Sequence, residues 1–286
     1  MMLVAGFVGC GGGVTRPNQD TVQQPQRIIC GSPAVAEIVF ALGCGNRVVG
    51  VSDYTAYPPE AASIEKIGGW MNPNRERILR LQPDLIITQG VHPALATFAK
   101  EYGLGFHSVN VDDLENIRRS IIEIAEILEV PERGAEMVEE MTTALDKVRS
   151  SVAEQSTPSV LLVLGRTPGS LSRISTVGPG TFLDEMITIA GGSNIFSDVT
   201  GAYPQVSKES IMARNPEVII DMHPDNLSTA LRQKMNEDWQ ALETVTAVAN
   251  GRISLIEENL LLVPGPRIAA AAELLAGIIH PETRHE

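Results

Sequence analysis

The chain repeats one pattern of helix, turn and buried strand at two places that lie 133 residues apart. The first copy covers residues 77–87 and the second 210–220, and in each a proline and an acidic residue precede an apolar run that ends in Ile-Ile. Residues 37–43 and 185–191 form a second matching pair, an amphipathic helix stopped by the glycine that a left-handed helix end favours. A repeat of this kind predicts two lobes of similar build.

Continuous apolar runs alternate with helical segments in both halves of the chain. Such runs are typical of strands that are buried on both faces, as in parallel sheets covered by helices. We expect these strands at residues 48–51, 85–88, 160–164, 218–221 and 253–256. The prediction is an α/β fold of two Rossmann-like lobes with mainly parallel sheets, the first over residues 27–131 and the second over 157–286.

The segment between the two halves predicts one long helix. Apolar residues recur there at spacings of three and four, which places on one helix face Val138, Met141, Leu145, Val148 and Val152. A helix over residues 132–154 would be roughly 35 Å long at 1.5 Å per residue. We therefore expect a stiff connecting helix within residues 132–156, which limits how far the lobes can close on each other.

Residues 1–26 predict a signal segment and a linker. The first nine residues are apolar and uncharged, and Phe7-Val8-Gly9-Cys10 resembles a bacterial lipobox, whose cysteine becomes lipid-modified. Phe7 stands where Leu is usual, and the Lys or Arg that opens a secretory signal is missing, which points to a start upstream of Met1. We expect a lipoprotein anchored at Cys10, in the periplasm or on the outer cell surface. The alternative is an apolar terminus with an incidental cysteine.

Composition excludes two classes of function. The formal net charge is −13, whereas nucleic-acid binding needs a basic face that neutralises phosphate. No apolar run reaches the roughly 18 residues of a spanning helix. We therefore expect a monomer that binds no nucleic acid and meets the membrane only through its lipid anchor.

Cys30 and Cys44 lie on either side of an expected helix of about ten residues. At 1.5 Å per residue the two thiols would lie near opposite ends of that helix, beyond the ~7 Å Cα separation that a disulfide allows. Both are predicted to be free, buried thiols.

Aromatic residues gather in the loops that follow the expected strands. Ligands of parallel α/β sheets bind outside the carboxyl ends of the strands, and four of the six Tyr and Trp residues fall in such loops: Tyr54, Tyr57, Trp70 and Tyr203. Aromatic walls with a few polar anchors suit a large planar or macrocyclic ligand. The alternative is that each ring packs against its own lobe.

The sequence carries no Gly-x-Ser-x-Gly, Gly-x-x-x-x-Gly-Lys or Cys-x-x-Cys motif. His92 and His223 each follow a strand and precede a proline, so pseudo-symmetry could bring them together on a metal ion. Two hydrogen-bonded loop histidines are the alternative that we favour. We expect neither an enzyme nor a resident metal or cofactor, with a metal-dependent α/β enzyme using these two histidines as the remote alternative.

Several short motifs occur in a fixed order over about residues 27–280: Ser32-Pro33-Ala34, Tyr57-Pro58-Pro59, Trp70 with Asn74, Glu76 and Arg77, Pro83-Asp84-Leu85, Tyr203-Pro204-Gln205-Val206-Ser207-Lys208-Glu209, and Pro266-Arg267-Ile268. Together they resemble the substrate-binding proteins of ABC importers whose two lobes are joined by one long helix, the class III periplasmic binding proteins. That family serves the uptake of cobalamin, haem, iron–siderophore complexes and some metal ions. Within it, the chain is most similar to the cobalamin-binding member.

The resemblance implies roles for individual residues. One glutamate on each lobe would dock onto arginines of the permease dimer, here Glu37 and Glu209; helix capping is the alternative reading of both. Four residues match positions that line the ligand cleft, namely Tyr54, Trp70, Tyr203 and Arg267. Gln89 and Arg166, which follow expected strands, complete the predicted ligand-binding set.

Departures from the cobalamin-binding pattern bear on the ligand. Asn259-Leu260-Leu261-Leu262 stands where an Asp-Trp pair is expected, Tyr203 replaces a tryptophan, and Ala190 and Ala276 lie near the sites of a disulfide found in some relatives. We expect cobalamin or a related corrinoid. The alternative is haem or a ferric siderophore, with Tyr54, Tyr203 or His92 as a metal ligand or with arginines gripping an anionic chelate.

Overall fold

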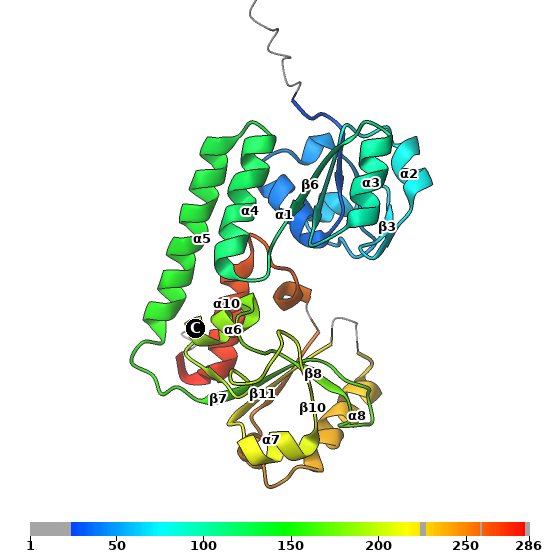
Figure 1. Cartoon of the computed structure of the whole chain (residues 1–286). Coiled ribbons are helices and arrows are strands. Elements are labelled where there is room, and N and C mark those ends of the chain that lie inside the picture. The colour runs from blue at the N-terminus through cyan, green and yellow to red at the C-terminus, as the bar shows by residue number, and fades with distance from the viewer. Residues whose placement is uncertain (1–23, 224–226, 258, 284–286) are drawn as a thin grey trace, which may run out of the picture.

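The computed structural model describes residues 24–223, 227–257 and 259–283, which form two lobes (Figure 1). The N-terminal lobe has a four-stranded parallel sheet in the order β2-β1-β5-β6. Its strands are β1 (Ile28–Cys30), β2 (Val48–Val51), β5 (Leu85–Gln89) and β6 (Gly105–Val109). A short hairpin stands beside it, made of β3 (Gly68–Gly69) and β4 (Asn72–Pro73).

The C-terminal lobe has a mixed sheet in the order β10-β8-β7-β11-β12, with β9 pairing with β7. Strands β7, β9, β11 and β12 run parallel, and β8 runs antiparallel to both of its neighbours, β7 and β10. Their bounds are β7 (Ser159–Gly165), β8 (Ile174–Thr176), β9 (Ser193–Asn194), β10 (Gln205–Val206), β11 (Val218–Met222) and β12 (Ile253–Ile256). All five strands predicted from apolar runs are present, within one residue at each end.

Helices cover both sheets. In the N-terminal lobe they are α1 (Pro33–Ala41), η1 (Gly45–Arg47), η2 (Pro59–Ser63), α2 (Arg75–Arg80) and α3 (Pro93–Glu101). In the C-terminal lobe they are α6 (Phe182–Ile189), α7 (Lys208–Arg214), α8 (Thr229–Gln240), α9 (Thr246–Ala249), η3 (Asn259–Leu262), α10 (Ile268–Ile279) and η4 (Pro281–Thr283).

The chain passes from one lobe to the other along α5 (Pro131–Ser151), the predicted connecting helix, which ends three residues earlier than expected. Helix α4 (Leu114–Ile127) packs antiparallel beside it, so that two helices line one side of the molecule (Figure 1). The start of α4 is held by the C-terminal lobe, because the backbone N–H of Phe182 donates to the carbonyl of Asp112 at 2.7 Å.

The repeat seen in the sequence is reproduced residue by residue. Asn74 caps α2 and Ser207 caps α7, each accepting a hydrogen bond from the N–H three residues on. Gln82 and Asn215, also 133 residues apart, both have a positive φ, of 47° and 46°. The glycines that end the second matching pair, at 43 and 191, both have a φ of 79°. The two lobes therefore share a local chain path and a parallel four-strand core, β2-β1-β5-β6 in one and β9-β7-β11-β12 in the other.

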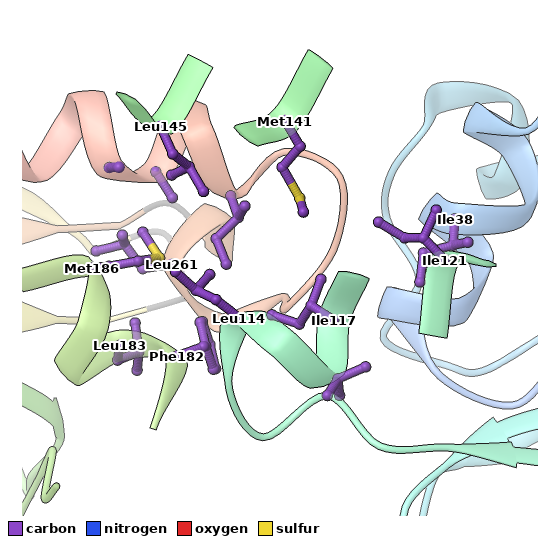
Figure 2. Close-up of a cluster of buried hydrophobic side chains, with 14 of the residues drawn as sticks. Ile38, Leu114, Ile117, Ile121, Met141, Leu145, Phe182, Leu183, Met186 and Leu261 are labelled. Atoms are coloured by element: carbon purple, nitrogen blue, oxygen red, sulfur yellow. The ribbon is translucent and has the colours of Figure 1, made fainter. Parts of the chain in front are cut away.

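One hydrophobic core runs through both lobes (Figure 2). It starts at Ile38 on α1, continues through Ile121 on α4 and Leu145 on α5, and reaches Met186 on α6 and Leu261 on η3. Because buried side chains are close-packed, lobes that share such a core resist large relative movements. This agrees with the stiffness expected from the connecting helix.

Cys30 and Cys44 are free and buried, as predicted, and burial raises the pKa of the Cys30 thiol. The predicted lipidation site Cys10 lies outside the described residues. Within the part of the chain that the structure describes, no helix has both the length and the apolar composition needed to cross a bilayer.

Candidate functional site

Large apolar side chains are exposed in the loops that follow the strands, on the sides of the lobes that face each other. We call this surface the inter-lobe face. Tyr54 is 75% exposed and Val91 is 87% exposed, and the other members are Tyr57, Met71, Tyr203 and Leu262. Exposed apolar side chains that gather on one face are typical of an interaction site. Tyr54 and Tyr203, which we expect to bind the ligand, both lie here, and Met71 and Val91 are exposed beside them in the loops after β3 and β5.

The loop that carries Tyr54 and the hairpin that carries Trp70 are fastened together by Asp53. The Asp53 carboxylate accepts a hydrogen bond from the N–H of Gly68 at 3.1 Å, and the Asp53 N–H donates to the Gly68 carbonyl at 3.0 Å. Gly68 has a φ of 101°, and a Cβ there would lie 2.9 Å from the carbonyl oxygen of Asn72, so the tight hairpin needs glycine. The two aromatic residues are thus held in a fixed relation.

A cavity of about 570 Å³ opens beside this hairpin in the N-terminal lobe. Its wall includes Trp70, Gln89, His92, Phe106 and Asp112. The indole N–H of Trp70 donates to the carbonyl of Gln89 at 2.8 Å, and the His92 ring meets the indole edge-on at 4.9 Å. The predicted pair Trp70 and Gln89 therefore lines one cavity, with the indole ring fixed in place.

Tyr203 brings the C-terminal lobe to the same region. Its phenol is half exposed, and burial together with the nearby charge of Asp112 raises its pKa, so the phenol stays protonated at neutral pH. Asp112 lines the cavity of the other lobe. Tyr203 of the C-terminal lobe therefore lies near a residue that lines the N-terminal cavity.

Arg166 does not reach the inter-lobe face, contrary to expectation. Its side chain has no exposed surface, and its guanidinium donates to Asp221 at 2.8 Å and to Asp238 at 2.7 Å. The ring of Trp239 lies 5.2 Å from its guanidinium carbon. A buried arginine with two carboxylate partners has no free donor to offer a ligand, so Arg166 stabilises the C-terminal lobe instead.

Asp221 is the centre of this buried network. It also accepts hydrogen bonds from the indole of Trp239 at 2.9 Å and pairs with the His223 ring at 3.0 Å. Burial acts to raise the pKa of Asp221, but the bond to His223, the charge of Arg166 and the bond from Trp239 outweigh it and hold the pKa below its usual range. The carboxylate therefore stays ionised in the folded protein.

The two histidines considered as metal ligands have separate surroundings. His223 is hydrogen-bonded to Asp221, as the alternative of two hydrogen-bonded histidines predicts. That alternative is wrong for His92, which packs against Trp70 and whose buried Nε2 has no hydrogen-bond partner in the described part of the chain. Burial lowers the pKa of His92. Among residues 24–223, 227–257 and 259–283, no group of three or more His, Cys, Asp or Glu side chains is arranged to hold a metal ion.

Comparison with protein families identifies the class. The family model described as periplasmic binding protein matches residues 28–260. The chain belongs to this family. It is the substrate-binding component of an ABC importer, a class of protein that delivers ligands to a permease.

Three known proteins illustrate the family's range. A vitamin B12-binding protein of Vibrio cholerae is 30% identical over 250 residues, covering 87% of this chain and 87% of the relative. The uncharacterized ABC transporter substrate-binding lipoprotein YvrC of Bacillus subtilis is 28% identical over 279 residues, covering 94% and 85%. The solved structure of the periplasmic haem-binding protein BhuT with two haems matches with a TM-score of 0.78 at 25% identity, covering 90% and 98%.

Glu37 is not available for docking onto a permease in this structure of the binding protein. Its side chain is 3% exposed, and both carboxylate oxygens are bonded to Arg267, at 2.9 Å from Nε and 2.5 Å from Nη2. Burial raises the pKa of Glu37, and the hydrogen bonds and charge of Arg267 oppose that rise. Arg267 is 26% exposed, and its guanidinium stacks on the ring of Tyr57, 3.9 Å from the ring centre.

Glu209 is exposed at the second residue of α7, where hydrogen bonds from its own backbone and from Ser207 lower its pKa. The repeat gives Glu209 a counterpart in the N-terminal lobe. Glu76 lies 133 residues earlier, is exposed, and is the second residue of α2. Glu76 and Glu209 therefore occupy equivalent exposed positions of the two repeats.

Proposed function

We propose that this binding protein captures cobalamin or a related corrinoid between its lobes and passes it, chemically unchanged, to an ABC permease. The observation that carries the proposal is the set of aromatic rings on the inter-lobe face, with the exposed Tyr54 and the partly buried Trp70 on one lobe and the exposed Tyr203 on the other. Aromatic and apolar walls suit the faces of a macrocycle, and ordinary burial would have hidden them. The vitamin B12-binding relative supports the choice of ligand.

A haem or a ferric siderophore is the second candidate. The haem-binding protein of similar structure supports it, and so do the exposed phenols of Tyr54 and Tyr203, because phenol oxygens are suitable donors for ferric iron. Under this alternative a tyrosine, rather than a ring face, makes the decisive contact.

Titration calorimetry of the purified chain with cyanocobalamin, and in parallel with hemin, tests the two candidates. We expect saturable one-to-one binding of cyanocobalamin, which Trp70→Ala weakens. Tyr102→Ser is the matched control, because Tyr102 is also exposed but packs against Phe98 at the end of α3. Binding of hemin with a shifted Soret band and no response to cyanocobalamin would transfer the proposal to the second candidate.

For docking, we propose Glu76 and Glu209 as the pair that meets arginines of the permease, in place of Glu37 and Glu209. Their support is equivalence: both are exposed second residues of capped helices at matching points of the repeat. The double variant Glu76→Ala, Glu209→Ala should abolish uptake and leave the affinity for cargo within a factor of about three. An equal loss of cargo affinity would show that these carboxylates shape the binding site instead.

We also propose that Cys10 carries the lipid anchor and that the protein works outside the cytoplasmic membrane. The lipoprotein relative YvrC supports this assignment. Metabolic labelling with a fatty acid, lost in Cys10→Ser, would test it; a label retained in the variant would contradict it.

A further inference from the structure

The first helix of each lobe, α1 or α6, presents a glutamate to the other half of the chain. Glu37 on α1 and Glu185 on α6 occupy the same position of the second repeated segment. Glu37 binds Arg267, the residue before α10. Glu185 accepts a hydrogen bond at 2.7 Å from the N–H of Leu114, the first residue of α4. Both glutamates therefore hold the start of a helix that belongs to the opposite half of the chain.

Arg267 makes three interactions with the N-terminal lobe, two hydrogen bonds and one stacking contact. Its guanidinium donates from two nitrogens to Glu37 and covers the ring of Tyr57, so all of these partners belong to the N-terminal lobe. Gly265 brings the preceding loop close to α1, because a Cβ at that position would lie 3.3 Å from the Glu37 carboxylate. A lysine could not make the two parallel hydrogen bonds and stack at once.

The inter-lobe face has two walls, formed by its exposed apolar residues on the N-terminal and on the C-terminal lobe, and the contact between Glu37 and Arg267 joins them. Tyr57 shares a loop with Tyr54, and Arg267 follows η3, which ends at the exposed Leu262. Among the described residues, Glu37–Arg267 is the ion pair that joins the N-terminal lobe to the C-terminal lobe. The other ion pairs lie within residues 27–131, within α5, or within the C-terminal lobe.

We propose that Glu37, Arg267 and Tyr57 form an inter-lobe tie that sets the spacing of the two walls, and that Glu37 and Arg267 are positioning residues that do not touch the cargo. The effect on cargo rests on the proposed function, since it assumes that cargo binds between these walls. The geometry of the tie itself does not. Glu185 is the counterpart on the other lobe, anchored to a backbone N–H rather than to a side chain.

The test measures lobe spacing directly. Spin labels at Glu101→Cys in α3 and Gln240→Cys in α8, both exposed positions, report the inter-lobe distance by pulsed electron–electron double resonance. The chain carries Cys10→Ser, and the buried Cys30 and Cys44 stay unlabelled. We expect one narrow distance distribution for this reference protein, and a distribution at least twice as broad for Arg267→Met.

Three further variants separate the tie from simple loss of stability. Glu37→Gln with Arg267→Gln leaves no unpaired buried charge and should broaden the distribution as Arg267→Met does. Arg267→Lys should give an intermediate width. Arg149→Met, which breaks an ion pair within α5, should match the reference.

Cargo affinity is the second readout. We expect Arg267→Met to weaken cyanocobalamin binding at least tenfold, and adding Glu37→Gln to that variant to cause little further loss. An unchanged distance distribution in Arg267→Met and in the double variant Glu37→Gln, Arg267→Gln would overturn the tie. Weaker binding with unchanged spacing would also overturn it, by making Arg267 a direct ligand contact. If the reference protein ignores cyanocobalamin, the proposed ligand fails while the distance measurement still decides the tie.

Discussion

The two lobes use the carboxyl ends of their strands in opposite ways. In the N-terminal lobe, Gln89 at the end of β5 and Trp70 in the β3–β4 hairpin line an open cavity. In the C-terminal lobe, the arginine after β7 is buried against Asp221, which lies within β11. Strand ends of the same parallel core thus line an open cavity in the N-terminal lobe, and they carry a buried polar network whose members bond to one another in the C-terminal lobe. A charged residue at a strand end is available to a ligand only where no carboxylate of the same lobe can reach it.

The largest effect should come from breaking the network in the C-terminal lobe. Arg166→Met leaves Asp221 buried without its cationic partner, and removing one member of a buried ion pair costs about 3–5 kcal/mol. Urea unfolding should show this loss. Arg149→Met removes an exposed arginine and should change the free energy of unfolding by less than about 0.5 kcal/mol. Equal effects of the two substitutions would mean that the network contributes no more than a surface pair.

The walls themselves should contribute unequally to cargo binding. Trp70 is fixed by its hydrogen bond to Gln89 and by His92, whereas Tyr203 is half exposed. Rigid, well-packed aromatics dominate binding energies, so Trp70→Ala should cost about 2 kcal/mol, roughly thirtyfold in affinity. Tyr203→Ala should cost less, on the order of 1 kcal/mol. The reverse order, measured by titration calorimetry, would make the C-terminal lobe the main receptor.

The smallest effect is a pH dependence of stability that is specific to one lobe. The pKa of Asp221 is below its unfolded value of about 3.9. A depressed carboxylate contributes stability that is present above the unfolded pKa and is lost as the pH falls through the folded pKa. The free energy of unfolding should therefore decrease as the pH drops below about 4. Asp221→Asn should make this decrease less steep. An unchanged slope in the variant would show that other carboxylates control acid unfolding.

The fold was predictable because its signals are local. Apolar runs such as 218–221 and helix ends such as Gly43 report burial and conformation within a few residues. The fates of Glu37 and Arg166 were not, because each depends on a partner 230 or 55 residues away. The family resemblance assigned Glu37 to a docking surface, and the position after an expected strand assigned Arg166 to the ligand site. Only the three-dimensional arrangement shows both side chains paired. The equivalence of Glu76 and Glu209, by contrast, follows from the 133-residue spacing of the repeat alone.

The shared core has a consequence for the order in which the chain can fold. Ile117 and Ile121 on α4 belong to the same core as Leu261, Ile268 and Leu275. During synthesis the first half of the chain is complete before those last residues emerge. Part of its apolar surface therefore stays exposed to solvent until the C-terminal residues are made. Truncation within α10 should therefore expose the N-terminal lobe as well, and a fragment ending near residue 130 would be prone to aggregate rather than fold as an independent domain.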